Sequence, residues 1–194
     1  MKSSAEDWNA SRDNARPSKD RSVPIVFLGG IFLPGQVEEV QRQSRGPVQY
    51  AADALQKAFL RGFAEASGSP VRAVSLPFVG SYPKGYRSLW FPARSGEYPT
   101  GVPIDGRRFF NLRFVKFLAR FFVSLSGLRA AVSQNQPTQI IVYSAHLPFL
   151  ASARVLRWLR PATKLCVILP DLPEFMGVGG RAYHTAKAIE SRLF

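Results

Sequence analysis

Polar side chains that could do chemistry follow two short apolar runs in the last third of the chain. His146 follows the run 139–143, and Asp171 and Glu174 follow the run 164–169. An imidazole can stabilise developing charge, and carboxylates can accept hydrogen bonds from hydroxyl groups. The simpler interpretation is that His146 caps a turn and that Asp171 accepts hydrogen bonds only from the amides of its own turn.

The two runs and the segment between them predict a strand, a helix and a second strand. Both runs are rich in β-branched or aliphatic residues, as expected for short strands buried on both faces. Residues 149–158 have helical spacing, and Pro161 ends that helix. In open parallel sheets, ligands bind at the carboxyl ends of the strands. We therefore expect His146 and Asp171 to lie at the same rim of one sheet.

A glycine pair, Gly29 and Gly30, follows the first predicted strand, 23–28. Because it lacks β-carbons, such a pair lets backbone amides approach a phosphate or a sugar closely. The full dinucleotide-binding fingerprint is absent, so a tight turn is the alternative. A helix that opens at 46–47 and a strand over 71–76 then complete a parallel, right-handed βαβ unit.

Strands that alternate with helices predict an α/β fold with a Rossmann-like, mainly parallel sheet flanked by helices. We expect a disordered polar tail over residues 1–22 and a single domain over residues 23–194. Residues 77–106 are rich in aromatic and basic residues, with a short strand near Trp90. They predict either a functional loop or a cover for the edge of the sheet.

The segment 107–132 predicts one long amphipathic helix. We expect its apolar face to pack on the sheet and its basic stripe to lie in solvent. The expected core residues are Phe114, Phe117, Phe121 and Leu125, and the basic stripe is Arg113, Lys116 and Arg120. Because the helix is basic and rich in phenylalanine, membrane or partner contact is the alternative for its flanks. The flanking residues are Leu112, Val115 and Phe122.

The composition limits the classes of partner. The formal net charge is +13, from 26 Lys and Arg against 13 Asp and Glu. Such a charge suits nucleic acid, an anionic membrane surface or a phosphate-bearing substrate, but no nucleic-acid motif is present. The single cysteine, Cys166, excludes a disulfide framework and is expected to be a buried core thiol. No secretory signal or membrane-spanning run is visible, so we expect a cytoplasmic protein.

Two of these stretches also carry a family resemblance. The residues Tyr-Ser-Ala-His-Leu-Pro-Phe at 143–149 and Ile-Leu-Pro-Asp-Leu-Pro-Glu-Phe-Met at 168–176 resemble the amino-terminal domain of bacterial family-4 glycosyltransferases with the GT-B fold. The stretches 44–52 and 75–83 resemble the first helix and second strand of the same family. The resemblance extends over residues 25–194.

The resemblance implies a retaining enzyme that transfers a sugar from a nucleotide-sugar to a glycan or lipid-linked acceptor in polysaccharide biosynthesis. It implies a catalytic role for His146 and no metal, and it implies no cofactor besides the nucleotide-sugar substrate. The residues implied to contact the acceptor or the donor are Gly29, Gly30, Ser44, Asp171 and Glu174.

The family's donor-binding domain, with its Glu-x7-Glu pair, has no counterpart in these 194 residues. We therefore expect the acceptor-side half of an enzyme, inactive alone, which is either truncated or paired with a separately encoded donor domain. The alternative is a non-catalytic Rossmann-like module that binds a membrane surface or a protein partner as a scaffold. The expected partners are the two substrates and, peripherally, the inner face of an anionic membrane, with no specific nucleic acid.

Overall fold

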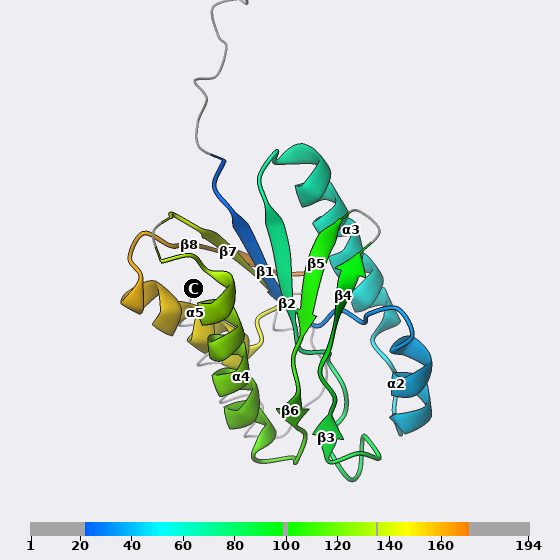
Figure 1. The fold of residues 1–194 in the computed structure, drawn as a ribbon. Coiled ribbons are helices and arrows are strands. Elements are labelled where there is room, and N and C mark those ends of the chain that lie inside the picture. The colour runs from blue at the N-terminus through cyan, green and yellow to red at the C-terminus, as the bar shows by residue number, and fades with distance from the viewer. Residues whose placement is uncertain (1–21, 99–100, 135, 171–194) are drawn as a thin grey trace, which may run out of the picture.

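The protein folds around a six-stranded, mostly parallel sheet (Figure 1). The computed structural model describes residues 22–98, 101–134 and 136–170. Along the sheet the strands are β4 (Arg94–Tyr98), β5 (Val102–Gly106), β2 (Val71–Ser75), β1 (Ile25–Gly29), β7 (Gln139–Tyr143) and β8 (Lys164–Ile168). Neighbouring strands are parallel except for β4, which is antiparallel to β5.

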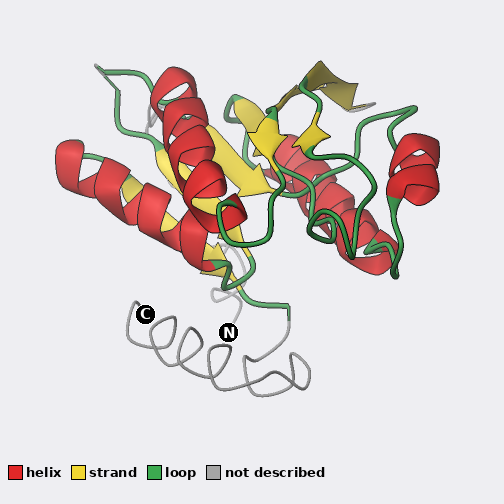
Figure 2. Ribbon diagram, turned by 90° about the horizontal axis from the view of Figure 1, so that it is seen from below, coloured by secondary structure: helices red, strands yellow, loops and turns green. Residues whose placement is uncertain are grey.

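Helices cover both faces of this sheet, as the two ribbon views show (Figures 1 and 2). They are α2 (Val37–Gln43), α3 (Tyr50–Ala66), α4 (Lys116–Ala131) and α5 (Leu147–Leu159). A separate two-stranded ribbon pairs β3 (Trp90–Phe91) with β6 (Phe109–Phe110). No helix in the described part of the chain has both the length and the apolar character needed to cross a bilayer.

The core is divided by the sheet into two layers. On one side Val26 packs in a cluster with Leu128 of α4 and Phe149 of α5. On the other side Phe27 packs in a second cluster with Leu60 of α3. Successive side chains of a strand point to opposite faces, so β1, which is buried along its whole length, contributes to both clusters. This arrangement puts β1 at the centre of the molecule.

The predicted α/β class is confirmed, as is the Rossmann-like, mainly parallel sheet. The unit β1–α3–β2 is parallel, and so is the unit β7–α5–β8, which the two apolar runs predicted. The prediction of a single long loop over 77–106 is wrong, because β4 and β5 form there; the short strand near Trp90 is confirmed as β3.

The prediction of one helix over 107–132 is also wrong. The segment begins with β6 and a turn, and α4 starts only at Lys116. The expected core residues Phe114 and Phe117 are exposed, whereas Lys116 and Arg120 are buried. The physical reason is that backbone carbonyls beneath α4 need hydrogen-bond donors, which these two cations supply.

The prediction that Cys166 is a buried core thiol is wrong, because its strand lies at the end of the sheet. Cys166 lies on β8, at the end of the sheet, and is exposed. The residues of β8 are only partly buried or exposed, so the apolar run 164–169 forms an edge strand, which the described part of the chain covers incompletely.

Candidate functional site at the rim of the sheet

The carboxyl ends of β1 and β7 lie side by side where the strand order reverses. The chain passes from β1 to β2 and β5 on one side, and it then returns to β7 and β8 on the other. In open α/β sheets this switch point is where ligands bind. Gly29 ends β1, and Ser144 follows directly after β7. The fold therefore brings the glycine pair and residues 144–146 to the same rim.

Ser144 has a backbone conformation that residues with side chains rarely adopt. Its φ is +72°, and its amide donates a 2.8 Å hydrogen bond to the carbonyl of Ile168. Left-handed backbone costs roughly 1–2 kcal/mol for a residue other than glycine, and such conformations cluster at functional sites. The bond ties the end of β7 to the end of β8 just before His146.

His146 is the N-cap residue of α5, and its carbonyl accepts hydrogen bonds from the amides of Phe149 and Leu150. Its side chain makes no capping hydrogen bond. The half-buried imidazole packs edge-on against Phe78 and Phe149, with ring centroids 5.5 and 4.8 Å away. The ring of Phe117, from α4, also packs against the imidazole, with its centroid 5.9 Å away. Aromatic packing therefore fixes the orientation of the ring at the rim.

Gly29 and Gly30 allow other groups to lie very close to the backbone, and in this structure those groups are the side chains of Gln56 and Phe78. A β-carbon on Gly29 would lie 2.3 Å from the Oε1 atom of Gln56. A β-carbon on Gly30 would lie 2.5 Å from the ring of Phe78. The Gly30 amide donates to Gln56 Oε1 over 2.7 Å. The packing of Gln56 and Phe78 therefore requires glycine here, whatever ligand binds.

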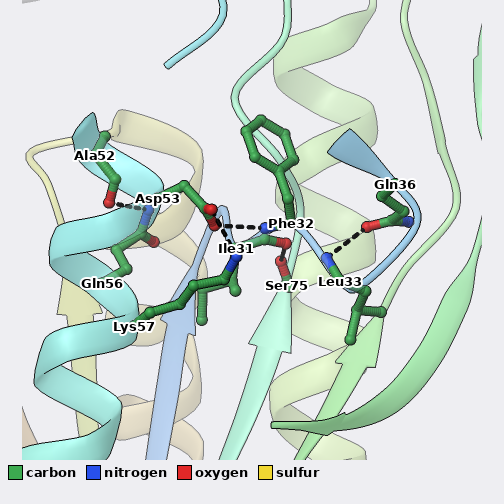
Figure 3. Close-up of polar contacts among 9 residues, drawn as sticks. All are labelled: Ile31, Phe32, Leu33, Gln36, Ala52, Asp53, Gln56, Lys57 and Ser75. Atoms are coloured by element: carbon green, nitrogen blue, oxygen red, sulfur yellow. Dashed lines mark hydrogen bonds and ion pairs between the residues drawn. The ribbon is translucent and has the colours of Figure 1, made fainter. Parts of the chain in front are cut away.

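The loop after β1 is held by side chains of neighbouring elements (Figure 3). The amide of Phe32 donates to Oδ1 of Asp53 at 2.8 Å, and the other carboxylate oxygen pairs with Lys57 at 2.6 Å. The hydroxyl of Ser75 donates to the carbonyl of Ile31 at 2.7 Å. A phosphate bound at this loop would compete with a buried carboxylate for the same backbone amide.

Three polar side chains from residues 111–120 hold the loop that follows β2. Arg120 donates to the carbonyls of residues 76 and 77, Lys116 to that of residue 79, and Asn111 to that of residue 80. Phe78 lies in the middle of this loop. These bonds therefore position the ring that packs against the imidazole.

Arg120 is fully buried, and its guanidinium lies over three aromatic rings. The rings are those of Phe78, Phe109 and Phe149, with centroids 5.2, 4.9 and 5.1 Å from the ζ carbon. Burial lowers the pKa of Arg120 to about 9, so the group stays charged at neutral pH. Burial, and then repulsion from Arg120, lower the pKa of Lys116 to about 7. Arg120 is therefore charged and Lys116 partly charged near neutral pH, which favours an anionic ligand at the rim.

Sequence reasoning missed this pair, because it assigned Lys116 and Arg120 to a solvated stripe. They lie four residues apart on one side of α4, and Ser124 continues that side and donates a 2.9 Å hydrogen bond to Ser152 of α5. Polar residues at positions 116, 120 and 124 of a mainly apolar helix were the signal that could have revealed a buried polar stripe.

The structure does not show the remaining predicted site residues next to His146. Ser44 is the C-cap of α2 and forms an isolated antiparallel bridge with Tyr86. Asp171 and Glu174 lie outside the described residues, although the strands that precede His146 and Asp171 pair in parallel and end at one rim. Among the residues that the structure describes, no group of three His, Cys, Asp or Glu side chains could hold a metal ion.

The parallel sheet and its reversal of strand order define a Rossmann-like α/β protein. Comparison with known families finds no family model that matches the chain, and comparison with curated proteins finds no match either. The rim combines an imidazole, aromatic rings and buried positive charge. Such a combination suits a ligand that contains sugar rings or phosphate groups.

Proposed function

We propose that the chain is the acceptor-side domain of a two-domain retaining glycosyltransferase with the GT-B fold. The complete enzyme transfers a sugar from a nucleotide-sugar to a glycan or lipid-linked acceptor. The observation that supports this most directly is the position of His146. It is the N-cap residue of α5 at the switch point of the sheet, and it lies inside the run 143–149 that resembles the family.

The chemistry of such a transfer suits the groups at this rim. The bond between the anomeric carbon and the phosphate oxygen breaks, the anomeric carbon bonds to an acceptor hydroxyl oxygen, and the hydroxyl proton passes to the leaving phosphate. Positive charge develops on the sugar and negative charge on the leaving phosphate, so fixed charges and hydrogen-bond donors lower the barrier. In this proposal His146 contacts the sugar or the phosphate, and the buried Arg120 supplies positive charge beside the Phe78 and Phe149 rings that pack against the imidazole.

The test is sugar transfer in the presence of a donor domain. The full chain is combined with a domain that carries the Glu-x7-Glu pair, and nucleotide release from a panel of nucleotide-sugars is measured with glycan and lipid-linked acceptors. We expect His146→Phe to lower the rate by about a hundredfold or more, because it removes the hydrogen-bonding groups. Because this variant keeps an aromatic ring among Phe78, Phe117 and Phe149, thermal melting should stay near that of the native chain.

Full activity in His146→Phe would remove the imidazole from the mechanism. Leu55→Ala serves as the control, because Leu55 is exposed on α3, away from the rim. This variant should keep full activity. Loss of activity in both variants would indicate a general effect on the fold.

A non-catalytic Rossmann-like binding module is the second candidate, and one observation favours it. The amides of Gly30 and Phe32 after β1 are already bonded to Gln56 and Asp53, so this loop offers a phosphate fewer donors. The chain contains two histidines, His146 and His184, so imidazole NMR gives one set of signals for each. A shift of the His146 signals by acceptor or nucleotide-sugar supports the transferase, and a shift by neither ligand supports the module.

A further inference from the structure

The outer side of α4 is apolar, although the helix buries polar residues. Phe114, in the turn before α4, and Leu118 and Phe122 within it are 83%, 62% and 63% exposed. They are spaced four residues apart and so lie on one side of the helix. Lys116 and Arg120 lie on the opposite, buried side. Because these cations bind backbone carbonyls under the helix, they set its rotation and leave the aromatic side outward.

Helix α5 extends this surface beside α4. The two helices lie next to each other on one face of the sheet (Figure 1) and are joined by the buried hydrogen bond between Ser124 and Ser152. Trp158 of α5 is 80% exposed, and with Arg154 and Arg157 it lines an open groove of about 610 Å³. We call the outward residues of both helices the α4–α5 face: Phe114, Leu118, Phe122, Arg154, Arg157 and Trp158.

The segment that contributes this face, residues 106–170, has charge of one sign only. Residues 106–170 contain ten Lys and Arg and no Asp or Glu. Besides the two arginines of the groove, Arg113 and Arg129 are exposed at the two ends of α4. A partner for the α4–α5 face must therefore accept apolar side chains and neutralise positive charge at the same time.

We propose that the α4–α5 face docks on the surface of an anionic lipid bilayer. The phenylalanine, leucine and tryptophan side chains enter the boundary between head groups and acyl chains, and the arginines contact lipid phosphates. A second copy of this chain fits less well, because a two-fold interface would set an acid-free basic face against itself. The proposal is independent of the glycosyltransferase proposal, since it uses residues outside the rim.

The test is sedimentation of the full chain with lipid vesicles. Vesicles of phosphatidylcholine alone are compared with vesicles that also contain phosphatidylglycerol, at low and high NaCl. We expect the chain to pellet with the anionic vesicles and to be released by salt, because the Debye length shortens. Leu118→Glu should lower the partition coefficient about tenfold, because it removes apolar contact and adds negative charge.

The matched control is Leu55→Glu. Leu55 is an exposed leucine of α3, which packs on the opposite face of the sheet from α4 and α5, so the same substitution there should leave vesicle binding at the native level. Circular dichroism melts check that both variants fold. Because Leu118 is exposed, no loss of stability is expected from its replacement.

Several results would overturn the proposal. They are failure of the native chain to pellet with anionic vesicles at low salt, equal binding to neutral vesicles, and native-level binding by Leu118→Glu. A concentration-dependent dimer that Leu118→Glu dissociates, without vesicle binding, would assign the face to a second copy of the chain. Saturable binding of an acidic protein or an RNA that excludes vesicles would assign it to that macromolecule instead.

Discussion

At the scale of single residues, the rim is built from contacts between residues far apart in the chain. The sequence shows that β-carbons are missing at Gly29 and Gly30, and it suggests close approach of some group. It does not show that Gln56 and Phe78 occupy the space, because nothing local links them to a glycine pair. In the same way, the end of a strand before His146 was predictable, but the aromatic surroundings of its imidazole were not.

Replacement of Gly30 by alanine tests this packing. The new β-carbon would meet the ring of Phe78 at 2.5 Å, so we expect the free energy of unfolding to fall by about 1–3 kcal/mol. Urea denaturation followed by circular dichroism measures the change. The control is Gly62→Ala within α3, where nothing lies within 4 Å of the added carbon, and alanine should stabilise the helix by about 0.5–1 kcal/mol. A neutral Gly30→Ala would show that Phe78 moves aside easily.

At the scale of elements, α4 shows why a pattern of apolar residues can mislead. Its phenylalanines predict a buried face, and the helical spacing itself is confirmed. The side that is buried depends on carbonyls of the loop after β2, to which Lys116 and Arg120 donate. Those carbonyls lie about 40 residues away in the sequence, as the separations of 37 and 43 residues show, so no local rule reveals them. The strand β5 was missed because Pro103 and Asp105 interrupt its apolar residues.

The buried lysine predicts how stability depends on pH. The pKa of Lys116 is about 7 in the folded chain and 10.5 as its ordinary value. Between these values the unfolded chain binds a proton that the folded chain has released, so stability increases as the pH rises. We expect the free energy of unfolding of the native chain to gain more between pH 7 and 9 than that of Lys116→Met.

Urea unfolding at several pH values over this range measures the two slopes. Lys164→Met provides the matched control, because Lys164 is exposed on β8, and it should keep the native slope. A Lys116→Met variant with the same slope as the native chain would show that the ammonium reaches water more freely than its burial indicates.

At the scale of the whole molecule, the alternation of apolar runs and helical spacing was sufficient to predict the class of fold. The order of the strands, with its reversal between β1 and β7, follows from long-range pairing and was only partly predictable. The crossover rule predicts the right-handed connection of each βαβ unit. It does not predict which unit lies at the edge of the sheet. That is why β8 was expected in the core and is found at the end of the sheet.

The exposed edge predicts how readily Cys166 is modified. Its thiol is exposed on β8, so a chromogenic disulfide reagent should label one thiol per chain without denaturant, at a rate of the order seen for a small free thiol. The same reaction in urea gives the total number of thiols per chain, and Cys166→Ser gives the background signal without a thiol. Labelling that begins only when the chain unfolds would contradict the exposed position.

In most amphipathic helices the apolar side chains hold the helix in the fold. In α4 the buried hydrogen bonds of Arg120 and Lys116 do this instead. Because polar contacts hold α4 in place, the side chains at 114, 118 and 122 contribute little to keeping the chain folded. The proposed binding to an anionic bilayer could therefore be strengthened or weakened by substitutions at these positions without a loss of folding stability. Variants that detach but melt at an unchanged temperature should be common among substitutions at these three positions.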